Sequence, residues 1–421
     1  MLSDFEFNLQ HQLSGLKALS NISKLAKVGY RFVGTDGDRK SIEFMKKQFK
    51  SYGLDIVELP IRVPTFEDEK PQLKILATEE ELECIAPLFS PSTPPGGIEA
   101  DVIVVGDGTE EDYRRANVQG KIVVLIETTV GFTKFWLGTF AERAAQAGAV
   151  GLILVHPMPW PYRMSMEAGN SNPEKRFCEQ KLPAVCISAV DGFKLMRAIG
   201  KGDTKVRLET KNLIEDRDSV IISAFHRGTQ HPEERVGIIA HRDSAIALGA
   251  NDNGSGSGTL LELARVLSQT KPKRSFEFIS STAEDGATIG AYKYCETHKE
   301  DLIKNMKALI DIDMLSGAGV VKQIEVGYWP DTEPIKHTDW LMKMVDDVAA
   351  DLGYGFGRLT AVWGVPEEGR FIDIGVPATC FWGDDDPYYH SIHDTADKVN
   401  PCNLKAAADT VAILAWRLAN E

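Results

Sequence analysis

The chain has 421 residues, 43% of them hydrophobic and 26% charged, which suits a globular protein with room for two domains. Its net charge of −14 disfavours nucleic acids and anionic membranes as partners, since both select a basic face. The N-terminal residues do not resemble a signal peptide, and no apolar run approaches the roughly 18 residues of a membrane span, so we expect a soluble cytoplasmic protein.

The first sixty residues predict two helices and then a strand. In the second helix Ile42, Met45 and Phe49 fall at helical spacing, and Gly53 suits the C-terminal cap. The strand is LDIVELPIRV. The segment RFVGTDGDRK, which starts at Arg31, reads as a turn with no chemistry of its own.

A change of composition after residue 64 indicates an inserted module, and we place it at 73–207. Proline-rich segments surround short apolar runs such as DVIVVGDG, GKIVVLIE and GLILVHP. Only two helices are indicated, in FAERAAQAGAV and DGFKLMRAIG. The module is therefore β-rich, and it offers no converging set of acids, bases or ligands. His156, at the end of a strand, is interpreted as a structural histidine.

The remaining segments, 1–72 and 208–421, are assigned to one discontinuous domain. From residue 208, strands and helices alternate, which is typical of an α/β domain with a mixed, mostly parallel sheet. The predicted strands include SVIISAF, RVGIIA, SFEFISST, KALIDIDM and PATCFWG. A closing helix places Val411, Leu414 and Leu418 on one face.

The ends of these strands carry histidines and carboxylates. RVGIIA stops at His241, SFEFISSTA at Glu284, and KALIDIDM contains Asp311 and Asp313, while an acidic loop with two histidines follows PATCFWG. Ligands bind outside the carboxyl ends of the strands in open α/β sheets, so these groups are expected at one site. The six cysteines form no CxxC pair and read as reduced thiols, which leaves His, Asp and Glu to hold any metal.

The glycine cluster GSGSG, which follows Asp252 closely, has two interpretations. A phosphate-binding loop would need a Gly-Lys-Ser or Gly-Lys-Thr ending, which is missing here. A turn of small residues that allows close packing of a helix against a strand explains the cluster better. Near the same site, His390 competes with His393 and Asp313 with Asp311 as metal ligands.

The segments H-x-D, GANDNGSG, AED-G, IDM and YHS-x-x-DT, in this order, resemble the signature of the di-zinc aminopeptidase and glutamate carboxypeptidase family of metallopeptidases. The insert, with GKIVV and AERAAQAGAVGLILV, resembles the protease-associated (PA) domain of many members. The likeness covers nearly the whole chain. It implies the zinc exopeptidase fold, in which helices sandwich a mixed, mostly parallel sheet, with an inserted β-rich PA domain.

Carried over by position, the resemblance implies a site for two divalent ions. His241 and Asp313 would bind one ion, Asp285 and His390 the other, and Asp252 would bridge them. The matches to Tyr-His-Thr and Asp-Met favour His390 and Asp313 over their competitors. Zinc is expected, with cobalt and manganese as alternatives.

Three further residues receive catalytic roles. Two zinc ions lower the pKa of a bridging water toward about 7, and Glu284 would take its proton and return it to the leaving amine. Asp243 would orient the imidazole of His241. Tyr389 would donate its phenol to the developing oxyanion.

Two departures from the family pattern stand out: the first exchanges one zinc-binding carboxylate for a shorter one, and the second bears on specificity and leaves the metal site untouched. Asp285 stands where many relatives have Glu, and Pro366-Glu367-Glu368 replaces a Ser-Asp-His loop that commonly lines the substrate pocket. Arg242, inside the H-x-D triplet, is either a structural ion pair or a group that recognises carboxylates.

We expect a metal-dependent exopeptidase acting on peptides, an aminopeptidase in first place. The alternatives are a carboxypeptidase of the glutamate-releasing kind, which would use arginines such as Arg242, Arg358 and Arg370, and a non-catalytic receptor-like relative. The oligomeric state is left open, with a homo-oligomer among the alternatives.

Overall fold

The computed structural model describes the chain in ten stretches, which are residues 1–106, 108–127, 137–166, 181–246, 248–285, 287–317, 321–327, 333–361, 366–383 and 386–421. They form two compact units, the larger from Met1–Val63 and Arg217–Glu421 and the smaller from Pro64–Asp216. The chain passes between them within two long strands, β1 (Asp55–Asp68) and β10 (Asn212–His226). No helix in these stretches has the length and apolar character that crossing a bilayer requires. The cytoplasmic location stays a prediction.

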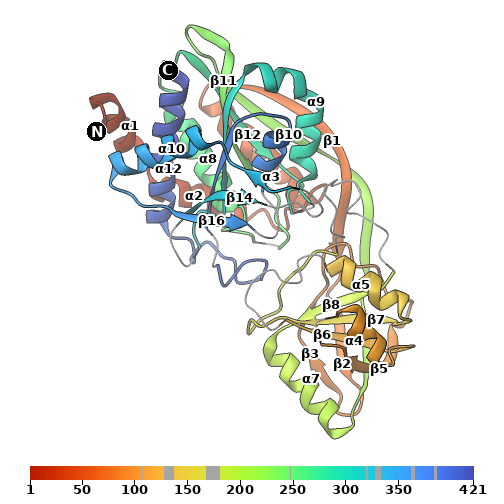
Figure 1. Ribbon diagram of the computed structural model, residues 1–421. Helices are drawn as coiled ribbons and strands as arrows, with labels where there is room; N and C mark the ends of the chain where they lie inside the picture. The colour runs from red at the N-terminus through yellow and green to blue at the C-terminus, as the bar shows by residue number, and fades with distance from the viewer. Residues whose placement is uncertain are drawn as a thin grey trace. The chain divides into compact units, whose positions relative to one another are not determined.

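The larger unit consists of one sheet and the helices that cover it (Figure 1). Besides β1 and β10, its strands are β11 (His231–His241), β12 (Arg274–Ser281), β13 (Met306–Asp313), β14 (Lys322–Gly327), β15 (Ile335–Lys336), β16 (Gly357–Ala361) and β17 (Ala378–Trp382). Its helices are α1 (Asp4–Gln12), α2 (Gly15–Ala26), α3 (Asp36–Ser51), α8 (Gly254–Leu267), α9 (Ile289–Asn305), α10 (Asp339–Leu352), α11 (Glu368–Asp373) and α12 (Pro401–Asn420).

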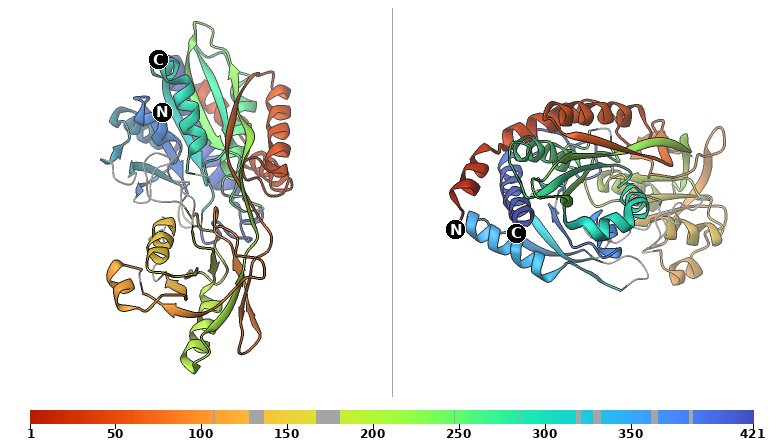
Figure 2. Two further views of the ribbon diagram at one scale, coloured as in Figure 1. Left: turned by 90° about the vertical axis from the view of Figure 1, so that its right-hand side faces the viewer. Right: turned by 90° about the horizontal axis from the view of Figure 1, so that it is seen from above.

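The sheet is mixed, with a parallel centre. Its strand order is β1-β10-β12-β11-β13-β17-β14-β15, and β16 pairs with β14. The strands β12, β11, β13 and β17 are parallel, whereas β10 and β14 join this group in antiparallel orientation. Helices α8 and α12 contact the central strands, as do α9 and α11, and helices lie on both faces of the sheet (Figure 2). The predicted fold class, a mostly parallel sheet sandwiched by helices, is confirmed.

The local sequence explains why the first elements form. Ser14 and Thr35 cap helices α2 and α3 by accepting hydrogen bonds from backbone N–H groups of the first turn. The apolar positions of α3 are buried at Met45 and Phe49, as the helical spacing predicted. However, three helices precede the first strand, not two. Residues 4–12 form an additional helix, for which Ser3 and Glu6 provide a capping box.

The glycine cluster is part of helix α8 and not a turn before it. A Cβ on Gly256 would lie 2.2 Å from the carbonyl oxygen of Ile312 in β13, and one on Gly258 would lie 2.5 Å from Ile22 Cγ1 in α2. No side chain fits at either position without movement of a neighbour. The glycines therefore allow α8 to lie against β13 and α2, which agrees with the packing interpretation.

The smaller unit contains an eight-stranded sheet of order β3-β2-β9-β5-β6-β7-β8-β4. Its strands are β2 (Gln72–Ile75), β3 (Glu80–Leu82), β4 (Cys84–Ile85), β5 (Ile98–Val104), β6 (Ile122–Ile126), β7 (Gly151–Val155), β8 (Ala184–Ile187) and β9 (Lys205–Glu209). Its described helices are α4 (Glu110–Arg115), α5 (Leu137–Gln146) and α7 (Ala189–Lys201). The expectation of two helices is wrong, because the six-residue helix α4 is too short for a periodic apolar pattern. His156 is buried and its ring stacks on Tyr162.

Candidate metal centre

The carboxyl ends of the central parallel strands lie at one edge of the sheet. His241 is the last residue of β11 and is in register with Ser281, the last residue of β12. Asp313 is the last residue of β13 and is in register with Trp382, the last residue of β17. Loops that start at these four positions therefore leave the sheet side by side, as expected for the ligand-binding edge of an α/β sheet.

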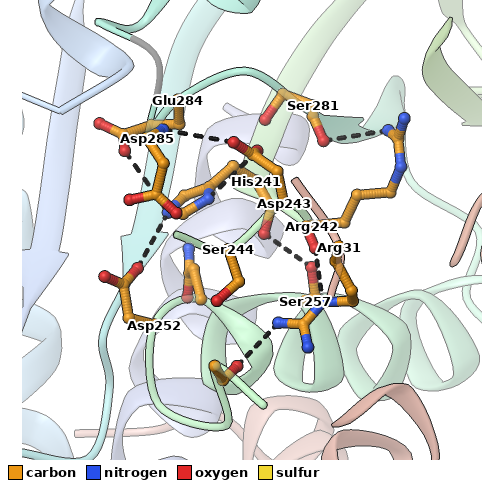
Figure 3. Close-up of polar contacts among 12 residues, drawn as sticks. Arg31, His241, Arg242, Asp243, Ser244, Asp252, Ser257, Ser281, Glu284 and Asp285 are labelled. Atoms are coloured by element: carbon orange, nitrogen blue, oxygen red, sulfur yellow. Dashed lines mark hydrogen bonds and ion pairs between the residues drawn. The ribbon is translucent and has the colours of Figure 1, made fainter. Parts of the chain in front are cut away.

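Asp252 lies between two histidines in the manner of a bridging ligand. Its Oδ1 is 3.4 Å from His241 Nε2, and its Oδ2 is 3.1 Å from His390 Nε2. The other two predicted ligands complete the two halves of the site. Asp313 Oδ1 is 3.4 Å from His241 Nε2, and Asp285 Oδ1 is 3.1 Å from His390 Nε2. All five residues are buried or nearly so, and Figure 3 shows three of them converging.

The donor set fits two divalent cations. Both ring nitrogens of His241 and Oδ1 of Asp313 are buried without a hydrogen-bond partner, although they face other donors and acceptors of the site at 3.4 Å. One ligand atom each of His241, Asp252 and Asp285 lies within 4.8 Å of the others. Histidine nitrogens and carboxylate oxygens, without sulfur, suit zinc and similar ions of hydrolytic sites.

The carboxylates of the site favour the protonated, positively charged form of both imidazole rings. Burial disfavours a protonated His390, yet Asp252 and Asp285 outweigh burial and raise its pKa to about 10. The same balance, with Asp313 as the main carboxylate, raises the pKa of His241 well above its usual range. Burial and the neighbouring Asp252 raise the pKa of Asp285 to about 6. The carboxylates thus attract cations, which metal ions would supply.

Glu284 lies beside the ligands and not among them. Its Oε2 is 3.8 Å from His241 Nε2, which is farther than the ligand oxygens. Burial, together with the negative charges of Asp313, Asp285 and Glu367, raises its pKa well above the usual range. A carboxylate with raised proton affinity suits a general base that must also return the proton.

Asp243 and Tyr389 contact the two histidines from outside. Asp243 Oδ1 is 3.4 Å from His241 Nδ1, and its Oδ2 accepts a hydrogen bond from the backbone N–H of Asp285 at 3.3 Å. Asp243 therefore couples one half of the site to the other. The ring of Tyr389 stacks on the ring of His390, with 3.8 Å between the centroids.

Asp311 and His393, the competing ligand candidates, lie elsewhere. Asp311 lies two residues before Asp313 in β13, and its Oδ2 accepts a hydrogen bond from the backbone N–H of Glu368 at 3.1 Å. His393 is exposed, whereas the side chain of His390 is 11% exposed. The geometry brings the five predicted ligands together and leaves both competitors outside the group.

The two glutamates of the unusual Pro-Glu-Glu segment are buried next to the site. Glu367 Oε2 accepts a hydrogen bond from Ser281 Oγ at 2.5 Å. Glu368 Oε1 is 3.0 Å from His337 Nε2. Burial, chiefly, raises the pKa of Glu368 to about 8, so the protonated form of this carboxyl group is favoured at neutral pH. The expectation that this segment departs from the family only in substrate specificity is too narrow, because both side chains support the sheet beneath the site.

Arg242 is structural. Its guanidinium is fully buried and donates to the carbonyl oxygens of Ser280 and Ser281 and to Asp38 Oδ1 at 3.1 Å. Figure 3 shows this side chain extending away from the carboxylates of the centre toward Ser281. Of the two interpretations of Arg242, the structural ion pair therefore holds, and recognition of a carboxylate does not.

Three supporting residues escaped the sequence analysis. Asp394 accepts hydrogen bonds from the backbone N–H groups of Asn251 and Asp252. Asn251 in turn accepts from the N–H of Ser316 at 2.9 Å. Arg31, in the segment interpreted as a turn without chemistry, donates to three backbone carbonyls near the site. Asp394 and Asn251 had a sequence signal, as the D of YHS-x-x-DT and the first N of GANDNGSG, whereas Arg31 had none.

The backbone is strained where it presents these groups. Ala283, Met314 and His390 adopt left-handed conformations with φ between 49° and 59°, although none is glycine. Such conformations are costly for residues with a side chain and concentrate at functional sites. Ala283 directly precedes Glu284, Met314 directly follows Asp313, and His390 is itself a predicted ligand.

Comparisons with known proteins show which families this chain is similar to. Residues 221–415 match the model of peptidase family M28, and residues 87–195 match the PA domain. Human carboxypeptidase Q is 26% identical over 414 residues, which cover 93% of this chain and 83% of that protein. Leucine aminopeptidase 2 of Trichophyton rubrum is 27% identical over 327 residues, which cover 76% of this chain and 62% of that protein.

Solved structures show the same fold. A peptidase M28 precursor from Shewanella amazonensis superposes with a TM-score of 0.83 at 23% identity, covering 99% of this chain and 96% of that one. A zinc aminopeptidase from Bacillus subtilis gives a TM-score of 0.76 at 23% identity, covering 97% and 96%. At these identities the likeness concerns the fold.

Proposed function

We propose that the protein is a two-zinc aminopeptidase of the M28 kind, since residues 221–415 match peptidase family M28 and residues 87–195 match the PA domain. The observation that carries the proposal is the position of Asp252, whose two carboxylate oxygens each face a different histidine. One carboxylate can bridge two ions about 3.5–4 Å apart. Bound there, the ions would polarise the scissile carbonyl and make the attacking water more acidic.

The residues of the chain divide the remaining work. Glu284 accepts the proton of the attacking water and passes it to the amine that leaves, a role for which its raised proton affinity is suited. Asp243 holds the imidazole of His241 in one orientation through Nδ1. Tyr389, stacked on His390, is proposed to donate its hydroxyl to the oxyanion.

The arginines of the larger unit favour an aminopeptidase over a carboxypeptidase. A carboxypeptidase needs cations to hold the terminal carboxylate of its substrate. Arg242 is committed to Asp38. Arg358 pairs with Asp346 at 2.6 Å, and Arg370 donates to Thr288 Oγ1 at 2.9 Å. All three candidates are thus engaged with the protein itself. The carboxylates around the metal centre suit instead the ammonium group of a free N-terminus.

The likeness to carboxypeptidase Q over 93% of this chain supports the carboxypeptidase alternative. Both activities are therefore compared in one experiment. We propose to assay aminoacyl fluorogenic substrates beside N-blocked peptides with a free C-terminal glutamate, with zinc, cobalt or manganese added. Hydrolysis of the aminoacyl compounds alone is the expected result. Release of glutamate from blocked peptides would show that the assignment of the substrate end is wrong.

The role of Glu284 is tested by Glu284→Gln, with Glu300→Gln as the matched control, because Glu300 is an exposed glutamate on helix α9. Loss of a general base reduces kcat by roughly 10²–10⁴-fold. We expect this loss for Glu284→Gln with unchanged metal content, measured by elemental analysis, and no loss for Glu300→Gln. Full activity of Glu284→Gln would contradict the proposed mechanism.

A further inference from the structure

We propose that Arg31 is a positioning residue for the metal centre, because its guanidinium fixes both ends of the loop that joins His241 to Asp252. The inference rests on the proposed two-metal site. Arg31 lies 210 positions before His241 in the sequence and belongs to no metal-ligand motif. What assigns the role is the set of contacts that its side chain makes.

The guanidinium of Arg31 is completely buried, and it donates to three backbone carbonyls. Nε donates to the oxygen of Arg242 at 2.8 Å, Nη1 to that of Leu248 at 2.6 Å, and Nη2 to that of Gly249 at 2.7 Å. Arg242 follows the ligand His241 directly, whereas Leu248 and Gly249 are a few residues before Asp252. One rigid planar group therefore sets the distance between the two ends of the loop.

The loop transmits this constraint to the bridging ligand. Gly249 is packed so tightly that a Cβ there would lie 2.5 Å from the carbonyl oxygen of Asp252 and 1.9 Å from Ser244 Oγ. Gly249 lies outside β11 and α8, and besides the Arg31 guanidinium its carbonyl oxygen accepts one backbone hydrogen bond, from the N–H of Gly254 at the start of α8 at 3.1 Å. A shift of its carbonyl would consequently displace the backbone of Asp252.

Arg31 is itself held from behind. The oxygen of Tyr30 accepts a hydrogen bond from Thr35 Oγ1, and a Cβ on Gly37 would lie 1.9 Å from that oxygen, so the segment is closely packed against the start of α3. The ion pair of Arg242 with Asp38, which lies in the first turn of α3, is a second link between this part of the chain and the loop. The segment before α3 thus serves as a fixed base for the ligand loop.

Charge and position act in opposite directions, which makes the inference testable. Asp394, Asp243, Asp252 and Asp285 are all electrostatic neighbours of the Arg31 guanidinium. A fixed cation near these carboxylates repels metal ions, so removal of the charge alone would strengthen metal binding. Loss of positioning would weaken it, as substitutions behind metal ligands do by roughly 10–100-fold.

The experiment compares Arg31→Lys, which keeps the charge and loses the planar fork, with Arg31→Met, which loses both. Zinc affinity of the purified full-length chains is measured by competition with a chromophoric chelator, and thermal stability is measured in parallel. We expect both variants to bind zinc about 10–100-fold more weakly than the wild type. We also expect activity to return toward the wild-type kcat at saturating zinc, since the catalytic groups are intact.

Arg235→Met is the matched control. Arg235 is also a buried arginine, but it lies near the opposite end of β11 and pairs with Glu277 and Asp301. Its loss should lower the melting temperature without changing zinc affinity. A merely structural Arg31 would behave in the same way.

The outcomes separate the two proposals. A wild-type chain that binds no metal would refute the proposed function. A wild type that binds two zinc ions, with Arg31→Lys equal to it and Arg31→Met equal or tighter, would overturn the positioning role alone. If Arg31→Met does not fold, Arg31→Lys decides the question at a temperature at which circular dichroism shows it to be fully folded.

Discussion

Gly256→Ala adds one methyl group at the contact between helix α8 and strand β13. Its Cβ would lie 2.2 Å from the oxygen of Ile312 and 2.3 Å from Asn253 Oδ1. Neither atom can move freely. Asn253 Nδ2 donates to the Ile312 oxygen at 3.0 Å, and Asn253 Oδ1 accepts from the N–H of Gly256 at 2.7 Å and of Met314 at 3.2 Å. The added methyl therefore has to open a clamp that holds the start of α8 to the end of β13.

The magnitude follows from three contributions. Overpacking in a dense core costs about 1–3 kcal/mol, and each buried hydrogen bond of the clamp that is lost adds about 1 kcal/mol. Alanine gains about 1 kcal/mol over glycine in a helix. The net loss is about 2–4 kcal/mol, which lowers the melting temperature of a unit of this size by roughly 5–10 °C.

Scanning calorimetry of the whole chain is the assay, because two compact units can give separate transitions. Gly200→Ala is the control. Gly200 lies near the end of helix α7, and a Cβ there meets no atom within 4 Å. Gly200→Ala should leave the melting temperature of the smaller unit unchanged or slightly higher. A Gly256→Ala protein as stable as the wild type would refute the packing explanation of the glycine cluster.

Two further predictions concern buried polar groups. Tyr294→Phe removes the hydroxyl that donates to the buried Glu277, so we expect a loss of about 1–3 kcal/mol in the free energy of unfolding by urea; a change within error would mean that the bond contributes nothing. Burial lowers the pKa of His156 to about 4, whereas the unfolded chain takes up this proton near 6.5. The stabilising contribution of the neutral imidazole is complete above about pH 6.5 and is lost as the pH falls toward 4, by up to about 1.4 kcal/mol per pH unit. Unfolding of the wild type and His156→Phe at several pH values should therefore show a steeper loss for the wild type, and parallel curves would contradict this reasoning.

Much of the fold could be predicted because the signals are local. The strands of the parallel centre are short runs rich in apolar residues, and α3 and α12 carry apolar residues at helical spacing. The elements that escaped prediction, such as α4 and the two-residue strand β15, are too short to show a period. The packing role of the α8 glycines was anticipated, although their place inside the helix was not.

Which donors are available at the candidate metal centre also followed from the sequence alone. Strands that end in His241 and Asp313 must present these groups at one edge of a parallel sheet, whatever the details of packing. The order of the motifs along the chain adds Asp252, Asp285 and His390. These conclusions depend on strand direction and on spacing, which are properties of short stretches of sequence.

The contacts of the charged residues around the centre became visible only in the folded chain. Arg31 and Arg242 look alike in sequence, yet one donates to backbone carbonyls of the loop between His241 and Asp252, and the other pairs with Asp38 in helix α3. Glu367 and Glu368 read as part of a pocket loop and are instead buried against neighbouring strands. The cause is the large separation in sequence between a buried charge and its partners. A buried charge is placed by partners that can lie some 200 residues away, and no local pattern records which of them packing brings within hydrogen-bond distance.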